Sequence, residues 1–379
     1  MSEVNALEMH SFLLSAEPGL PFEVYPPAVN ANPAVRVDLF EPETGVPDHK
    51  TAAVFSHPTV PVAGFYMFKP LQAMGLPCLA VATRFLGSDA TLNMERCIQD
   101  VGTAIRFLKE RGYEKIILLG FSGGGSLMTF YQAQAESLSA TKTPDGRPSG
   151  LLPQHLPPAD KIVLFGQHLG RAQTMQNVLD ASVLDERDLT KIDPELDVFD
   201  AKHGPPFSEA FIAKIRKGQQ ARMQRITDWV KARLATLEVA HGPGADEAFV
   251  VHRTNADPYM FEKTSDFKGD PQAVREMNLA ANGLGRFTSL RSWLSQWATD
   301  ISHANGPRDL SQTSIPVLSI VQKGDHRAHP TYLKQWEEAM GERFSQHHYF
   351  DAGHYMDPKE QREMIINVAK LIVTFAFSD

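Results

Sequence analysis

Cysteine is scarce in this sequence. Only two of its 379 residues are cysteines, Cys78 and Cys97, and each lies inside an apolar stretch. A free cysteine in such a setting behaves as a small hydrophobic residue. We therefore predict that both are reduced core residues rather than disulfide partners or catalytic groups.

Long apolar runs are absent as well. No segment approaches the roughly 18 to 20 consecutive apolar residues that a membrane-spanning helix needs. Residues 1–14 contain no basic region followed by a long apolar segment and a small-residue cleavage site, as a secretory signal would. The sequence therefore predicts a soluble, cytoplasmic protein with no membrane partner.

The charged residues form no concentrated basic stripe. The formal net charge is −8 at pH 7, which argues against nucleic acid as the main partner. With 42% hydrophobic and 22% charged residues, the composition is that of an ordinary globular protein. A chain of this length without internal repeats predicts one large α/β domain with a substantial insertion, or two domains.

Short apolar runs that end in turn or polar residues predict buried parallel strands. Between two of these runs, apolar residues recur at helical spacing, with Thr91 as the predicted N-cap and Gly112 as the predicted stop. Strand, helix and strand at this spacing form a right-handed crossover, so we expect a mostly parallel sheet flanked by helices. The predicted strands are 51–59, 76–84, 115–120 and 161–166.

The alternation of strands and helices stops from about residue 168 to 310. The clearest helix in this region begins after Pro205 and Pro206, at Ser208. A structureless loop of that length would be implausible inside a compact domain, so we predict a separate helical layer. The α/β pattern then resumes with a strand at 315–325, a helix at 330–340, the segment 344–354 and a C-terminal helix.

A glycine-rich turn follows the strand at 115–120. It reads Gly120–Phe121–Ser122–Gly123–Gly124–Gly125, which fits neither the G-x-G-x-x-G spacing of a dinucleotide site nor a P-loop, which needs a lysine. It does fit G-x-S-x-G between a strand and a helix, the pattern of a nucleophile elbow. In that turn the serine hydroxyl stands over the N-terminus of the next helix, where a developing negative charge is stabilised.

Two later residues have the chemistry and the placement to activate Ser122. A serine hydroxyl is a poor nucleophile until a histidine removes its proton, and that histidine needs an acid to fix its tautomer. Asp325 stands at the end of the strand segment 315–325, and His354 lies just past the last predicted strand. The three residues thus form a candidate triad at the carboxyl ends of parallel strands.

These residues and their order resemble the α/β-hydrolase superfamily, over roughly 50–167 and 312–379. The resemblance implies a nucleophile Ser122, an acid Asp325 and a general base His354. It also implies an α/β-hydrolase core made of 1–167 and 311–379, a large helical cap at 168–310, and no cofactor.

Other histidines and carboxylates near the candidate triad have simpler interpretations. We expect His347 and His348 to lie within the last strand, and Asp351 and Asp357 to be structural because they are so close to His354 in sequence.

A metal site is also conceivable next to the acid. Asp325, His326 and His329 form a D-H-x-x-H cluster, but no further carboxylate or cysteine stands at convincing ligand spacing. We therefore predict no metal.

The oxyanion hole should combine the backbone N–H of Gly123 with one from the loop after the first predicted strand. Members of the superfamily often carry His-Gly-x in that loop, whereas this chain has His57–Pro58–Thr59. Because proline has no N–H, the resemblance assigns the second donor to Thr59.

Four residues are weaker candidates for substrate contacts. His57 belongs to the predicted oxyanion loop. Arg84, at the end of a predicted strand, would bind a substrate carboxylate or, more simply, form a surface ion pair. Trp293 and Trp297 would either line a pocket or pack between helices.

The residues and the resemblance together predict a serine hydrolase that cleaves a carboxylic ester or lactone of a bulky, mostly apolar small molecule. The same triad also serves hydrolysis of a carbon–carbon bond beside a ketone, and thioesterase or peptidase activity. A ligand-binding receptor that keeps the fold without turnover is the alternative from another class. The sequence allows a homodimer but does not specify one.

Overall fold

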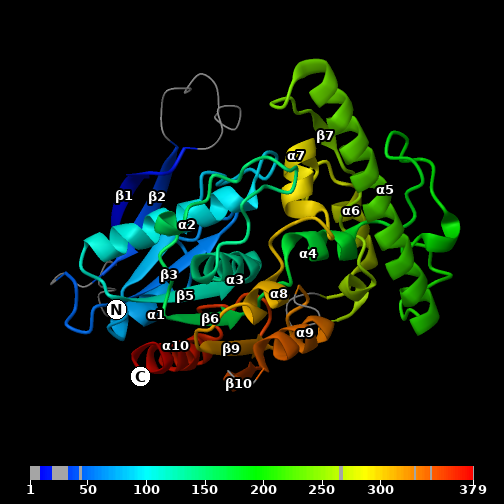
Figure 1. The fold of residues 1–379 in the computed structure, drawn as a ribbon. Helices are drawn as coiled ribbons and strands as arrows, with labels where there is room; N and C mark the ends of the chain where they lie inside the picture. The colour runs from blue at the N-terminus through cyan, green and yellow to red at the C-terminus, as the bar shows by residue number, and fades with distance from the viewer. Residues whose placement is uncertain are drawn as a thin grey trace.

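An eight-stranded sheet runs through the centre of the protein (Figure 1). The computed structural model describes residues 9–18, 33–41, 45–263, 268–327, 330–341 and 344–378. The strands lie side by side in the order β1-β2-β4-β3-β5-β6-β9-β10. Their bounds are β1 Met9–Ser15, β2 Ala34–Phe40, β3 Thr51–His57, β4 Cys78–Ala82, β5 Lys115–Phe121, β6 Lys161–Phe165, β9 Val317–Gln322 and β10 Phe344–Phe350.

Six neighbouring strands of this sheet, from β4 to β10, are parallel. This confirms the predicted fold class, and all six come from segments predicted as strands. The antiparallel edge strands β1 and β2 are absent from the prediction. The side chains of β1 are mostly exposed, and β2 carries Arg36 and the buried Asp38, so neither strand reads as a continuous apolar run.

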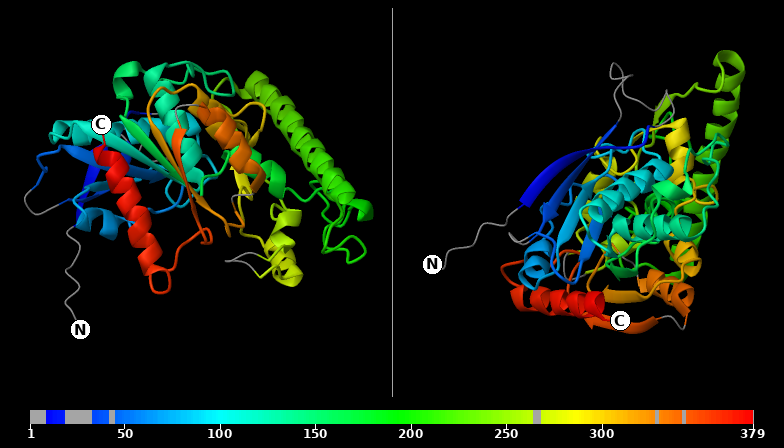
Figure 2. Two further views of the ribbon diagram at one scale, coloured as in Figure 1. Left: turned by 90° about the horizontal axis from the view of Figure 1, so that it is seen from below. Right: turned by 60° about the vertical axis from the view of Figure 1, so that its left-hand side comes forward.

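Helices cover both faces of the sheet. On one face lie α1 (Phe68–Ala73) and α10 (Arg362–Phe377); on the other lie α2 (Met94–Glu110), α3 (Gly123–Glu136), α8 (Gly306–Ser311) and α9 (Pro330–Met340). Figure 2 shows α10, in red, on its side of the sheet. Successive strand residues point to opposite faces, so Val54 packs with the α2 and α3 layer and Phe55 with the α1 and α10 layer.

The predicted start of α2 is wrong by two residues. Its N-cap is Asn93, whose side chain accepts a hydrogen bond from the N–H of Arg96, rather than Thr91. Asparagine is as good an N-cap as threonine because its side-chain oxygen also reaches a free helical N–H. The predicted stop is confirmed: the helix ends at Glu110, and Gly112 follows with φ +102°.

The region between β6 and α8 contains the longest helix of the protein, which stands apart from the sheet (Figure 1). This helix, α5, begins after an N-cap at Ser208, as predicted. Two clusters of buried apolar side chains give the region cores of its own. Its elements are α4 Arg171–Val178, α5 Glu209–His241, β7 Ala248–Val250, α6 Pro271–Leu279, β8 Phe287–Ser289, α7 Leu290–Ser292 and a π-helical turn Trp293–Trp297.

We call residues 168–305 the helical insertion. The next helix, α8, packs against α3 and α9, so the chain has returned to the helical layer of the sheet at Gly306. The cap boundaries 168 and 310 remain a prediction.

The structure places both cysteines of the sequence. Cys78 and Cys97 are both free and buried, as predicted. Among the described residues, no helix combines the length and the apolar character that a bilayer crossing requires. No cluster of three or more His, Cys, Asp or Glu side chains suited to a metal is present in the described ranges either; His329 lies outside them.

Candidate active site

Ser122 occupies a strained turn between β5 and α3. Its backbone has φ 54° and ψ −130°, and a non-glycine residue in the left-handed region costs on the order of 1–3 kcal/mol. The neighbouring glycines allow the close approach that this turn needs. A Cβ on Gly120 would lie 2.9 Å from the Cα of Gly125, and one on Gly124 would lie 2.4 Å from the carbonyl oxygen of Ser56.

The structure brings Ser122, His354 and Asp325 into one chain of hydrogen bonds. His354 Nε2 lies 3.1 Å from Ser122 Oγ, and His354 Nδ1 lies 2.7 Å from Asp325 Oδ2. All three residues are buried. They meet because β5, β9 and β10 are parallel, so the residues that follow each strand gather at the same edge of the sheet.

The carboxyl group of Asp325 is held in its charged form. Burial alone would raise its pKa, but the hydrogen bond from His354 and the N–H donated by Arg327 hold the pKa below its ordinary value. An ionised carboxylate at Nδ1 fixes the tautomer that leaves Nε2 free to accept a proton from the serine.

The other histidines and carboxylates near the triad, which were alternatives to His354 and Asp325 in the sequence, do not take their places. His347 and His348 are residues of β10. Asp351 is exposed, and Asp357 accepts a hydrogen bond from the N–H of Lys359. The carboxylate that contacts the ring of His354 is that of Asp325.

His168 is a site residue that the sequence analysis missed. The ring of His168 stacks on that of His354 with centroids 5.5 Å apart. The backbone N–H of His168 donates to the carbonyl oxygen of Ser122. Burial is the largest cause, and the charge of His354 the second, of the lowering of the pKa of His168 to about 3. The signal that could have found it is its position just after β6, the neighbour of β5 in the sheet.

The predicted second oxyanion donor is already engaged. The N–H of Thr59 donates to His57 Nδ1 over 3.2 Å, which contradicts the expectation that Thr59 offers a free donor. Gly123, the predicted first donor, follows the serine as the first residue of α3. The first N–H groups of a helix have no partner within the helix, so the Gly123 N–H suits an oxyanion.

Arg84 forms a buried ion pair, and this differs from both predicted roles, a substrate contact and a surface ion pair. Its guanidinium is 2.6 Å from Asp100 Oδ1, and the side chains of Arg84 and Asp100 are 11% and 0% exposed. Asp100 also accepts the N–H of Arg84. The pair is therefore neither on the surface nor available to a substrate carboxylate.

Trp293 and Trp297 pack inside the helical insertion. Both are fully buried in the apolar cluster around α5. Trp293 Nε1 donates to Thr227 Oγ1 over 3.0 Å, and the guanidinium of Arg171 lies 4.2 Å from the Trp297 ring centroid. Of the two predicted roles, the structure supports helix packing.

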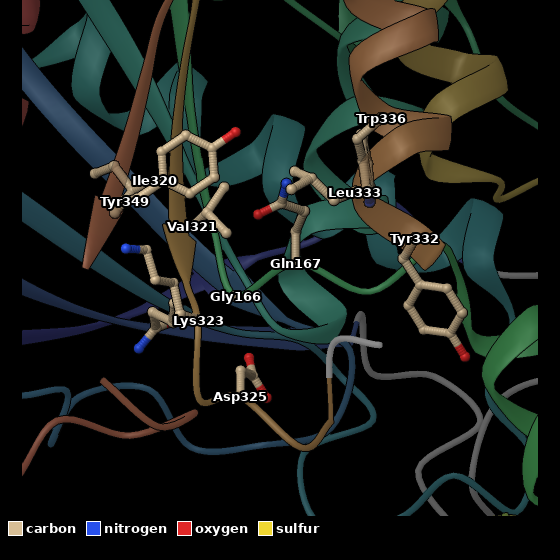
Figure 3. Close-up of a pocket in the computed structure, with 11 residues that line it drawn as sticks. Gly166, Gln167, Ile320, Val321, Lys323, Asp325, Tyr332, Leu333, Trp336 and Tyr349 are labelled. Atoms are coloured by element: carbon tan, nitrogen blue, oxygen red, sulfur yellow. The ribbon is translucent and has the colours of Figure 1, made fainter. Parts of the chain in front are cut away.

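Two cavities of similar size adjoin the loop that carries Asp325. The first, about 300 Å³, lies between the sheet and α9, and the triad residue that lines it is Asp325. Figure 3 shows its walls, with Tyr332, Leu333 and Trp336 on one side and Ile320, Val321 and Tyr349 on the other.

The second cavity, about 320 Å³, lies between the helical insertion and the same loop. Its walls mix apolar side chains with polar and charged ones. The insertion contributes Thr174, Val178, Thr254, Asn255, Asp257, Tyr259, Met260, Met277, Ala280, Asn282, Gly283 and Leu284, and the core contributes His326, Arg327 and Tyr332.

Solved structures share this architecture over nearly the whole chain. An alpha/beta hydrolase, GrgF from Penicillium sp. sh18, is 12% identical and covers 98% of this chain and 99% of its own, with a TM-score of 0.52. The protein DcsB, in complex with its substrate analogue, is 11% identical and covers 97% and 100%, with a TM-score of 0.53. This chain has the α/β-hydrolase fold. No family model and no curated protein matches the sequence of this α/β-hydrolase-fold protein.

Proposed function

We propose that this protein is a serine hydrolase that cleaves a carboxylic ester or lactone of a bulky, mostly apolar small molecule. The observation that carries the proposal is the hydrogen-bonded chain from Ser122 through His354 to Asp325. The strained backbone of Ser122 adds support, because a strained serine turn costs stability and adds no packing. The activity belongs to the carboxylic ester hydrolases.

In the first half of the reaction, His354 Nε2 takes the proton of Ser122 as the hydroxyl oxygen bonds to the acyl carbon. The carbonyl oxygen becomes an oxyanion, to which the N–H of Gly123 donates. The tetrahedral intermediate collapses, the imidazolium of His354 gives its proton to the leaving alcohol, and an acyl-enzyme remains. Ionised Asp325 stabilises the imidazolium throughout.

In the second half, His354 takes a proton from water as the water oxygen attacks the acyl carbon. Collapse of the second tetrahedral intermediate breaks the bond to Ser122 and returns the proton to its oxygen, which releases the carboxylic acid. Every proton moves between His354, Ser122, water and the leaving group, so the reaction needs no cofactor.

The cavity between the helical insertion and the acid loop supports the choice of substrate. Met260, Met277 and Leu284 give it apolar walls, and its volume suits a small molecule. Ligand sites at the boundary between two parts of a protein are common. We assign the insertion the role of a cap that encloses the substrate and limits water.

The first test is intact-mass labelling with a fluorophosphonate at neutral pH, comparing the wild type with Ser122→Ala. We expect one adduct on the wild type and none on the variant, followed by turnover of activated esters. A panel of thioesters, peptides and 1,3-diketones then separates the other reactions that this triad serves. A wild type that neither labels nor turns over any of them would have a closed cap or an unactivated Ser122, and would favour the ligand-binding receptor.

A further inference from the structure

The oxyanion loop of this protein lacks the usual backbone donor. Pro58 has no N–H, and the next two N–H groups of the loop, those of Thr59 and Val60, both donate to His57 Nδ1, over 3.2 Å and 3.1 Å. In this arrangement the loop directs its N–H groups at a side chain rather than at the nucleophile. A hydrolase of this fold then has only the Gly123 N–H for the oxyanion, unless a side chain supplies the second.

The two hydrogen bonds fix the tautomer of His57. A ring nitrogen that accepts N–H groups carries no proton of its own, so Nδ1 is unprotonated. Burial, together with the positive charge of Arg171, lowers the pKa of His57 to about 3. The ring is therefore neutral at pH 7, and its one N–H is at Nε2.

Nε2 lies against the residue that follows the nucleophile. A Cβ on Gly123 would be only 2.7 Å from His57 Nε2, so the ring edge and the Gly123 backbone are in close contact. The arrangement follows from the sheet, because His57 ends β3 and the paired strand β5 leads into Ser122. As a whole residue His57 is of intermediate exposure, and the hydrogen bonds that the structure shows for its ring are the two at Nδ1.

We propose that the Nε2–H of His57 is the second oxyanion donor of this enzyme. The proposal rests on the proposed function and adds to it a catalytic residue that replaces a backbone N–H. A neutral imidazole donates a hydrogen bond to the developing oxyanion without transferring its proton, and the loop N–H groups hold it in the required tautomer. Removing one donor from an oxyanion hole lowers kcat by about 10²- to 10³-fold.

Two substitutions of His57 separate its proposed role as an oxyanion donor from its role in positioning the loop. In His57→Asn the side-chain oxygen takes the place of Nδ1, so the loop keeps its acceptor and the hole loses its donor. In His57→Gln the amide nitrogen takes the place of Nε2, so the hole keeps a donor and the loop loses its acceptor. We expect His57→Asn to lose about 10²- to 10³-fold in kcat, with little change in KM, and His57→Gln to retain at least about tenfold more activity.

The opposite order of the two variants would overturn the proposal and make His57 a residue that positions the loop. Equal activities would overturn it too. The midpoint of thermal unfolding, measured for both variants and for Ser122→Ala, shows whether the compared proteins are folded.

A second measurement, by NMR on the wild-type protein, does not require the substituted side chains to keep the position of the His57 ring. In protein labelled with ¹⁵N-histidine, we expect Nε2 of His57 to be the protonated nitrogen and Nδ1 the unprotonated one, with His57→Asn used for assignment. A boronic acid that forms a tetrahedral adduct with Ser122 should move the Nε2–H proton resonance downfield. A proton on Nδ1, or an Nε2–H resonance that the adduct leaves unmoved, contradicts the proposal.

Failure of this inference is distinguishable from failure of the proposed function. A wild type that is labelled at Ser122 and hydrolyses esters, with His57→Asn equally active, would remove the role of His57 and leave the serine hydrolase intact. A wild type that is never labelled and turns over no ester would overturn both.

Discussion

The carboxyl edge of the sheet and the helical insertion use buried polar groups differently. At the edge, Ser122 holds a strained backbone, and His57 Nε2 lies close to Gly123 in the nucleophile turn. In the insertion, the fully buried side chain of Arg222 pairs with Glu186 and donates to the carbonyl oxygens of Asp180 and His252. The difference teaches that burial of a polar group alone does not mark function.

Removing the nucleophile should have the largest effect. We expect Ser122→Ala and Ser122→Gly each to lower kcat for an activated ester by about 10⁴- to 10⁶-fold, because the covalent step is lost. The two variants should differ in stability, since glycine adopts a positive φ without strain. Chemical denaturation should therefore show Ser122→Gly to be more stable than Ser122→Ala, and equal free energies of unfolding would mean that the strain is no larger than the roughly 0.4–1 kcal/mol that glycine costs through the unfolded chain.

In the insertion, the largest expected effect comes from Arg222. Its side chain is fully buried, forms a bidentate pair with Glu186 and donates to the carbonyl oxygens of Asp180, His252 and Arg253. Arg222→Ala leaves all of these acceptors without their donor, and breaking a buried pair costs about 3–5 kcal/mol. We expect a loss of that size in the free energy of unfolding, measured by denaturant titration.

Arg225 is the matched control for Arg222. It contacts the same Glu186, but its side chain is 44% exposed, and surface pairs contribute about 0–1 kcal/mol. Arg225→Ala should therefore be close to the wild type in stability. Equal losses for the two variants would mean that the pair with Glu186, rather than the buried carbonyl oxygens, stabilises the insertion.

The edge of the sheet was more predictable from sequence than the insertion. Buried parallel strands such as β5 and β9 read as largely apolar runs; Ser122 directly follows β5 and Asp325 comes three residues after β9. His354 follows β10, whose sequence FSQHHYF is mixed, by four residues. The cavity wall has no such signal, because Asn255, Met277 and Arg327 belong to segments with no common period.

The errors at the site itself have a different cause. The resemblance assigns the second oxyanion donor to Thr59 from a loop sequence, yet that role depends on which acceptor its backbone N–H meets in space. Arg84 looked available because its partner Asp100 is separated from it by part of a crossover unit. Such pairings are fixed by tertiary packing and leave no local pattern in the sequence.

A methyl group at Gly124 tests how tightly the nucleophile turn is packed. A Cβ there would lie 2.4 Å from the backbone oxygen of Ser56, and overpacking typically costs about 1–3 kcal/mol. We expect Gly124→Ala to lose stability by this amount and to be labelled more slowly by a fluorophosphonate. Gly64→Ala, with no heavy atom within 4 Å of the added Cβ, should behave as the wild type. Normal labelling of Gly124→Ala would show that the turn tolerates a shift.

The smallest expected effect concerns Asp145, which links the core of the protein to the helical insertion. This carboxylate lies in the core and pairs with Arg147 and with Arg291 of α7. Burial would raise its pKa, but the hydrogen bonds from Thr143 and Arg291 and the charges of both arginines lower the pKa below its ordinary value. A carboxyl group whose pKa is lower in the folded state stabilises the protein above its unfolded pKa, about 3.9. That contribution disappears as the pH falls through the folded pKa.

Asp145→Asn should therefore be less stable than the wild type at pH 7, and the difference in free energy of unfolding should shrink below about pH 4. At low pH the aspartic acid and the asparagine are both neutral, so neither attracts the arginines. Asp48→Asn, which changes a carboxylate on an exposed residue, controls for general effects of charge. A stability difference that stays constant from pH 7 to pH 3 would mean that the shape of the side chain, and not its charge, holds the insertion to the core.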